Sequence, residues 1–234
     1  MQLAIRQACK HLPVSSVHVF WDDVESSVPQ LQWTTTGYSE FTQVQNLSQV
    51  QPYQQGWIRQ QFAKMSLHRI LNDTEWIVLD ADTVLRNDWN FDNNRWYYDP
   101  DESCNDYWDF AKFAVGVNPT SQRYMSPLWR CERQVLTALE EAIYNKHSTC
   151  LEQTFLNSGM HSISEVEMYA QFAIQCMGKT YKFVPHQLRM IQTDQFVNTW
   201  NDSTDDVCLG GADAVGQQFW QQWPEIVINW FKFL

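Results

Sequence analysis

The sequence has 234 residues, and its 27 Asp and Glu against 16 Lys and Arg give a formal net charge of −11. This acidity argues against nucleic acid and anionic membranes as partners, because both repel a negatively charged surface. The chain has no run of about 18 apolar residues, which argues against a membrane span, and no CxxC pair among its six cysteines, which favours reduced thiols in the cytoplasm.

The first 80 residues predict helices alternating with strands. Residues 15–23, SSVHVFWDD, predict a strand that ends in two acids, and residues 56–71, GWIRQQFAKMSLHRIL, predict a helix. Residues 76–80 predict a strand with an apolar run typical of a parallel sheet covered on both faces. The other predicted segments are a short amphipathic helix at 2–11, an irregular stretch at 24–54 with room for a strand near 30–35, and a turn at 72–75.

The rest of the chain continues this alternation. A long helix is expected at 126–146 with Pro127 in its first turn, and another at 162–178 that ends at Gly178. The remaining segments are a polar, aromatic loop at 88–110, a strand at 179–186 and a helix at 213–222. Together these elements predict an α/β fold, with one compact, doubly wound (Rossmann-like) domain over residues 1–234 and a mainly parallel central sheet.

Two carboxylates follow the apolar strand directly. The stretch EWIVLDADTVLRND, residues 75–88, places Asp80 and Asp82 at the carboxyl end of the strand, where open α/β sheets bind their ligands. Two carboxylates one residue apart suit a hard divalent cation with oxygen ligands. The structural alternative is that Asp80 starts a turn and Asp82 caps the segment after it.

Two enzyme classes share this pattern. A GT-A glycosyltransferase uses a DXD motif to hold Mn²⁺ or Mg²⁺ against a nucleotide-sugar diphosphate, and a haloacid-dehalogenase phosphatase has an apolar strand followed by DxDx[TV]. The stretch IVLDADTV fits both. In the phosphatase the strand normally opens the domain, whereas about 75 residues precede it here. The phosphatase also needs a downstream lysine and an acidic pair, for which Asp205 and Asp206 are the candidates.

A helical wheel places a lysine on an apolar face of the helix before this strand. Lys64 shares a face with Trp57, Leu67 and Leu71, and Gln60 borders that face. We therefore expect Lys64 to point into the protein, where its ammonium needs an anion. The alternative is a lysine that extends its ammonium to water.

These segments resemble a group of short GT-A glycosyltransferase-like proteins from bacteria and phages. The shared pattern is a Gly-Trp-x-x-Gln-Gln-x-x-Lys helix, a strand ending in DxDT, and a later SExExY helix, here GWIRQQFAK, WIVLDADT and SEVEMY. The resemblance is strong over 56–85, fair over 126–172 and weak elsewhere, and the usual opening strand, whose loop holds the nucleobase, is not evident.

The resemblance implies sugar transfer from a nucleotide-diphosphate sugar, with a UDP-sugar favoured and the acceptor unknown. Lys64 and Asp80, with Gln60 beside them, would bind the donor, and Asp80 and Asp82 would bind Mn²⁺ or Mg²⁺. The nucleotide and metal half would cover about 1–90 and the acceptor half about 91–234. A non-enzymatic alternative is a nucleotide-sugar binding module without turnover.

Later residues could complete the site. His186 ends the predicted strand at 179–186 and is the expected third metal ligand, because GT-A enzymes often complete the metal site with a His after a late strand. His161 is its rival, and the alternative is that His186 is only a polar turn residue beside Pro185. Glu165 and Glu167 open the last long helix and are candidates for the general base that deprotonates an acceptor hydroxyl. Both glutamates also fit capping boxes, Ser162-x-x-Glu165 and Ser164-x-x-Glu167. The acidic loop at 99–109 is expected to be solvated surface.

Overall fold

The computed structural model of the chain describes residues 8, 10–12, 17–21, 41–45, 56–69, 71–80, 83–86, 88–91, 94–98, 100, 106–118, 120–126, 128–160, 162–186, 188–191 and 214–217. The chain divides into two compact units, each of which collects segments that are distant in sequence. Unit 1 comprises Met1–Gln51, Asp80–Asn90 and Gln187–Leu234, and unit 2 comprises Pro52–Leu79 and Phe91–His186. The prediction of one GT-A domain stays a prediction, and the coarser prediction of a mixed α/β protein is confirmed.

The described part of unit 1 consists mainly of short strands. The predicted strand at 15–23 is confirmed as β1, which pairs in parallel with β2 from the stretch expected to be irregular. The helix predicted at 213–222 is wrong where the structure describes it, because β9 lies there between β4, antiparallel, and β8, parallel. Backbone hydrogen bonds to a strand on each side of β9 outweigh its weak local helix pattern. These strands are β1 (Val17–Trp21), β2 (Phe41–Gln45), β4 (Val84–Leu85), β8 (Leu188–Ile191) and β9 (Ala214–Gln217).

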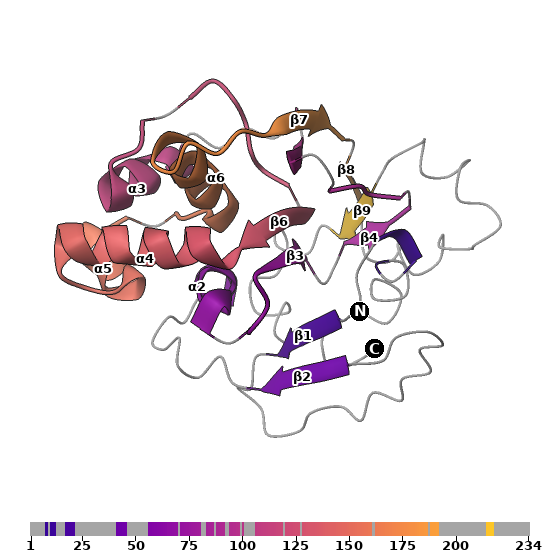
Figure 1. Cartoon of the computed structure of the whole chain (residues 1–234), viewed down its shortest axis with the longest axis horizontal. Helices are drawn as coiled ribbons and strands as arrows, with labels where there is room; N and C mark the ends of the chain where they lie inside the picture. Colours follow the sequence, from indigo (N-terminus) through magenta and orange to yellow (C-terminus); the bar gives the residue numbers. More distant parts are fainter. Residues whose placement is uncertain are drawn as a thin grey trace. The chain divides into compact units, whose positions relative to one another are not determined.

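Unit 2 contains most of the described helices, and Figure 1 shows α3, α4, α5 and α6 gathered on one side of its strands. Its strands form two separate pairs. The helices are α2 (Gly56–Met65), the 3₁₀ turn η2 (Leu67–Arg69), α3 (Asp106–Val115), α4 (Arg133–His147), α5 (Leu151–Ser158) and α6 (Glu165–Gln175). The strands are β3 (Glu75–Leu79), β5 (Arg95–Tyr98), β6 (Leu128–Glu132) and β7 (Lys182–Pro185).

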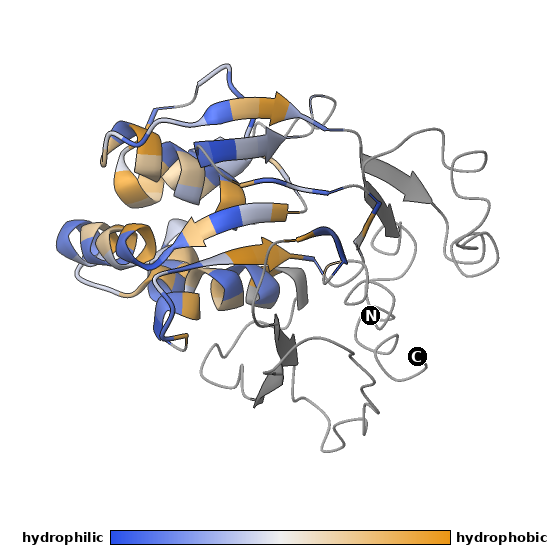
Figure 2. Cartoon of the chain, turned by 45° about the vertical axis from the view of Figure 1, so that its right-hand side comes forward, coloured by the Kyte–Doolittle hydropathy of each residue, from blue (hydrophilic) through white to orange (hydrophobic). Residues whose placement is uncertain are grey.

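The apolar strand before the two aspartates is confirmed as β3, and Figure 2 shows its apolar end in orange. Its described neighbour is β6, which pairs with it antiparallel from Glu75 opposite Glu132 to Leu79 opposite Leu128. The expectation of parallel pairing is therefore wrong for this edge of β3. Within the apolar run Val78 is buried and Trp76, Ile77 and Leu79 are partly buried, which either pairing direction permits.

The helix predicted at 126–146 begins later than expected. Residues Leu128–Glu132 are the strand β6, and α4 starts only at Arg133. Leu128, Trp129 and Cys131 are buried, and pairing with β3 gives the backbone of this stretch its hydrogen bonds. Pro127 therefore precedes a strand, and the tertiary partner overrides the local helix signal.

The loop predicted at 88–110 is also wrong in part, because it contains β5 and the start of α3. Trp96 on β5 is 2% exposed, and its indole N–H donates to the backbone oxygen of Tyr124 at 2.9 Å. β5 pairs in parallel with β7, which confirms the predicted strand at 179–186. α5 was not predicted at all.

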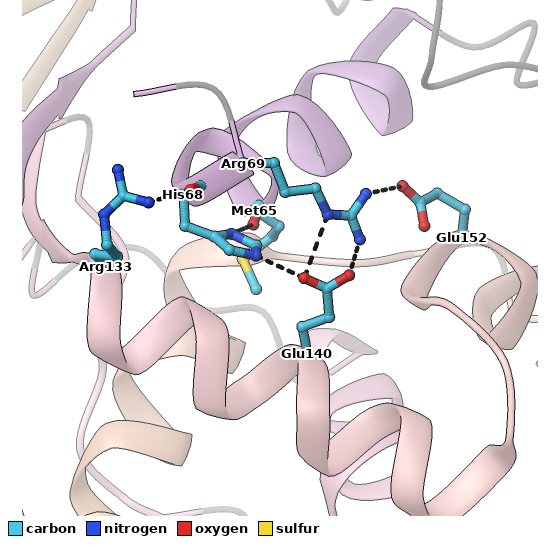
Figure 3. A network of polar contacts seen from close by, with 6 residues as sticks. All are labelled: Met65, His68, Arg69, Arg133, Glu140 and Glu152. Atoms are coloured by element: carbon cyan, nitrogen blue, oxygen red, sulfur yellow. Dashed lines mark hydrogen bonds and ion pairs between the residues drawn. The ribbon is translucent and has the colours of Figure 1, made fainter. Parts of the chain in front are cut away.

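A polar network fixes the end of the helix that carries Lys64 (Figure 3). The ring of His68 in η2 lies between the backbone oxygen of Met65, 3.1 Å from Nδ1, and Glu140 Oε2, 2.6 Å from Nε2. Arg69 donates to both oxygens of Glu140 and forms a longer ion pair with Glu152 at 3.8 Å. The turn after α2 is thus fastened to both α4 and α5.

Arg133, the first residue of α4, contacts His68 (Figure 3) and also the segment before β3. Its guanidinium donates to the backbone oxygens of His68, at 2.5 Å, and Asp73, at 3.0 Å, and its backbone N–H donates to the oxygen of Thr74 at 2.9 Å. One residue therefore holds both ends of the connection between α2 and β3. This arrangement fixes where β3 starts relative to α2.

α6 lies in the interior of unit 2, in contact with α2, α3 and α4. All nine residues from Glu165 to Ala173 are buried, including both glutamates. The predicted helix at 162–178 is confirmed over Glu165–Gln175, and Gly178 follows with a left-handed φ of 67°. Two buried carboxylates at the start of such a helix need specific partners, because an unpaired buried charge is costly.

Candidate functional site

The partner of Lys64 is Glu165. Lys64 lies in the last turn of α2, and its Nζ is 2.7 Å from Glu165 Oε1 at the start of α6. The two side chains are 13% and 6% exposed, so the ion pair is largely shielded from water. The prediction that Lys64 points into the protein is confirmed. Its role in donor binding stays a prediction.

Gln61, one turn before Lys64 on α2, contacts the same carboxylate. With its amide nitrogen toward Glu165, Gln61 donates to both carboxylate oxygens. The opposite orientation gives one contact, from the backbone N–H of Glu165 to Gln61 Oε1 at 3.4 Å, but sets the amide oxygen against the carboxylate. We therefore assign the amide nitrogen to the carboxylate side. Sequence reasoning missed Gln61, although its i, i+3 spacing from Lys64 within the QQxxK stretch was available.

Glu167 is held by several donors. Oε1 accepts the backbone N–H of Tyr124 at 3.0 Å, and Oε2 accepts Gln171 Nε2 at 3.2 Å and the indole N–H of Trp108 at 3.3 Å. Burial raises the pKa of the Glu167 carboxyl above its ordinary value, although these hydrogen bonds act in the opposite direction. The carboxylate joins α3 and the segment before β6 to α6.

Ser164 caps the same helix. Its Oγ accepts the backbone N–H of Glu167 at 3.2 Å, and its backbone is extended, with φ −123° and ψ 120°. The capping part of the Ser164-x-x-Glu167 prediction is therefore confirmed. The catalytic roles of Glu165 and Glu167 stay predictions.

The first aspartate of the DxD motif follows β3 in the chain. Asp80 is partly buried, and its backbone oxygen accepts the N–H of Thr83 at 3.0 Å. This contact agrees with the first part of the structural alternative, that Asp80 starts a turn, and it does not decide what the Asp80 carboxylate does. Asp82 lies outside the described residues, so its predicted role as a metal ligand stays a prediction.

The other predicted site residues are distributed along unit 2. His186 follows β7 and is 3% exposed, and its backbone N–H donates to the oxygen of Tyr98 at 3.0 Å. Gln60 is exposed on α2, and His161 lies outside the described residues. Within the described part of the chain, no group of three His, Cys, Asp or Glu side chains is arranged to hold a metal ion.

A buried thiol lies near the Lys64–Glu165 pair. Cys131 on β6 is fully buried, and burial raises its pKa well above the ordinary value, with the negative charges of Glu132 and Glu165 adding to the effect. Cys131 is therefore a neutral thiol that packs as a small apolar group. It is no candidate for a nucleophile.

No protein-family model and no curated protein matches the chain. Among the described helices, none combines the length and apolarity that crossing a bilayer requires.

Proposed function

We propose that the protein is a metal-dependent glycosyltransferase that transfers a sugar from a nucleotide-diphosphate sugar, with a UDP-sugar favoured, to an acceptor. The observation that carries this proposal is a shielded ammonium, that of Lys64, on the helix that precedes the strand leading to Asp80. Its partner in the structure is the carboxylate of Glu165, and the phosphate oxygens of a donor form the same charge-assisted hydrogen bonds with an ammonium. The resemblance of GWIRQQFAK and WIVLDADT to GT-A proteins supports the same assignment.

Asp80 and Asp82 are the proposed metal ligands, with His186 as the third. Carboxylate oxygens and an imidazole nitrogen suit Mn²⁺ or Mg²⁺. Charge supports the need for a cation, because two unit charges about 4 Å apart repel by roughly 4 kcal/mol at an effective dielectric near 20. The negative charges of the diphosphate and of the two aspartates would give several such repulsions, in a protein whose net charge is −11. When bound, the ion would stabilise the charge on the leaving diphosphate.

Glu165 is the better candidate for the general base. The oxygens of Glu167 accept three hydrogen bonds from Tyr124, Gln171 and Trp108, which gives this carboxylate a structural role. Glu165 is held by Lys64, which would bind the donor, and by Gln61. A carboxylate beside the donor is suitably located to accept the proton of an acceptor hydroxyl.

A cytoplasmic location is proposed on the chemistry of the cysteines. The described residues Cys131, Cys150 and Cys176 are free thiols, and two of them are exposed. Exposed thiols persist in a reducing compartment.

The test is binding and turnover across a panel of nucleotide sugars. The protein is stripped with EDTA, and calorimetry is run with UDP- and GDP-sugars alone and after addition of Mn²⁺ or Mg²⁺. We expect binding only with metal, followed by release of a nucleoside diphosphate. Metal-dependent binding without release, with water or a panel of sugar acceptors present, would favour the binding module. Hydrolysis of a generic phosphate ester would favour the phosphatase instead.

A further inference from the structure

The ion pair between Lys64 and Glu165 joins two groups that the proposed reaction uses separately. The 2.7 Å contact occupies the Oε1 atom of the proposed base with the ammonium proposed to bind the donor. While the contact lasts, Glu165 compensates the charge of the ammonium that would attract the diphosphate, and the carboxylate is held against α2. Donor binding by Lys64 and proton transfer to Glu165 therefore compete with the ion pair between them.

The groups around Glu165 form an anion-binding site, and the protein's own carboxylate occupies it. Two donors from one face of α2, the ammonium of Lys64 and the amide of Gln61, converge on a single carboxylate. Glu165 is also the first residue of α6, where the end of the helix dipole favours negative charge. Phosphate oxygens form the same charge-assisted hydrogen bonds as carboxylate oxygens. A diphosphate could therefore take the place of this carboxylate.

We infer that Glu165 is the internal counter-ion of Lys64 before the donor binds, and that the donor's diphosphate displaces it; this inference rests on the proposed function. Displacement frees both oxygens of Glu165. One of them can then take the acceptor hydroxyl proton while the hydroxyl oxygen bonds to the sugar carbon. The bond from that carbon to the diphosphate breaks, and the diphosphate leaves with the electron pair. Glu165 is thus released from Lys64 only when a donor is present.

The first experiment is a double-mutant cycle with pyrophosphate, which contains neither a nucleobase nor a sugar. Calorimetry with Mn²⁺ and pyrophosphate is run on the wild type, Glu165→Gln, Lys64→Met and the double variant. We expect roughly tenfold tighter binding for Glu165→Gln and a loss of about ten- to a hundredfold for Lys64→Met. In the Lys64→Met background, Glu165→Gln should not change the pyrophosphate affinity further, because its gain in affinity depends on the ammonium that it releases.

A matched control separates this effect from a change in net charge. Lys179 and Glu132 form an equally short pair, also at 2.7 Å, with side chains 28% and 14% exposed. Glu132→Gln changes the charge by the same amount and should leave pyrophosphate affinity within about twofold. If Glu165→Gln bound no more tightly than the wild type, or only as much more tightly as Glu132→Gln, the displacement would be refuted.

A second measurement follows Glu165 in the wild-type protein and uses the Glu165→Gln variant only to assign its resonance. Glutamate is labelled with ¹³C at the carboxyl carbon, Mg²⁺ replaces the paramagnetic Mn²⁺, and pyrophosphate is titrated. The Glu165 resonance, assigned by its loss in Glu165→Gln, should shift as it leaves Lys64, while that of Glu132 stays in place. Binding of pyrophosphate without a shift at Glu165 would overturn the inference.

The two proposals fail in different ways. If pyrophosphate shows the expected cycle but no nucleotide sugar binds or turns over, the glycosyltransferase assignment fails and the diphosphate site remains. If a nucleotide sugar is turned over but the cycle shows no coupling between Lys64 and Glu165, only the displacement fails. If the wild type binds neither pyrophosphate nor nucleotide sugars, both proposals fall.

Discussion

Ser164 Oγ accepts the backbone N–H of Glu167 at 3.2 Å, which makes Ser164, and not Ser162, the N-cap of α6. Ser164→Ala should lower the free energy of unfolding by about 0.5–2 kcal/mol, because a buried N–H loses its acceptor. Ser162→Ala is the matched control and should stay within about 0.5 kcal/mol of the wild type. Chemical denaturation measures both. Equal losses from the two variants would contradict the assignment of the cap.

Glu167→Gln should destabilise the protein even though it preserves the shape of the side chain. The three donors from Tyr124, Gln171 and Trp108 would compete for one amide oxygen, and the new amide group would face an N–H. We expect a loss of about 1–3 kcal/mol in denaturant titrations. Glu141→Gln, at an exposed position of α4, serves as the neutral control. A variant with unchanged stability and about 10²–10⁴-fold slower turnover would instead identify Glu167 as the base.

Lys64→Met should lower the free energy of unfolding by more than the similar size of the two side chains suggests. The substitution leaves the carboxylate of Glu165, 6% exposed, without its ammonium, and breaking one side of a buried ion pair costs about 3–5 kcal/mol. Adding Glu165→Leu to Lys64→Met should recover most of the loss, because an apolar pair needs no counter-charge. Thermal and urea unfolding of the two variants tests this. A Lys64→Met protein as stable as the wild type would mean that the pair contributes nothing to the fold.

Glu140 should make stability depend on pH below the neutral range. Burial by itself would raise the pKa of Glu140, but hydrogen bonds and charge from Arg69 and His68 outweigh it and hold the pKa below its ordinary value of 4.5. A carboxyl with a lowered folded-state pKa adds stability above the unfolded value, and this stability is lost as the pH falls through the folded pKa. The wild type should therefore exceed Glu140→Gln in stability above pH 4.5, with the difference shrinking below it.

The measurement is urea unfolding of both proteins from pH 7 down to the onset of acid unfolding. Glu141→Gln, whose exposed carboxylate lies on the same helix, should run parallel to the wild type at every pH. A difference between wild type and Glu140→Gln that did not change with pH would show that the network in Figure 3 is not electrostatic in origin.

Asp82→Ala should abolish metal-dependent binding of a nucleotide sugar without lowering the melting temperature, because the proposed ligand acts on the metal and not on the core. Calorimetry with Mn²⁺ and a UDP-sugar measures the loss. Asp73→Ala, which removes an exposed aspartate in the turn before β3, should bind like the wild type. Undiminished affinity in Asp82→Ala would remove the metal assignment.

The sequence by itself determined the elements whose signal is local. The periodicity of residues 56–71 predicted α2, which ends at Met65 and is followed by the 3₁₀ turn η2, and it predicted the inward direction of Lys64. The run from Trp76 to Leu79 predicted β3. Helical periodicity is a property of one segment of about four turns, so it can be recognised without knowledge of distant residues. The same holds for α6, whose N-terminal Ser and Glu spacing is a local signature of a cap.

Only the tertiary structure decided the elements that depend on a distant partner. Leu128–Glu132 is a strand because β3 pairs with it, and Ala214–Gln217 is a strand because β4 and β8 flank it. The anion beside Lys64 is Glu165, 101 residues later in the chain, and composition or spacing cannot show which carboxylate fills that position. Strand pairing and buried ion pairs are set by contacts between segments that the fold brings together, and the local pattern of either segment does not contain that information.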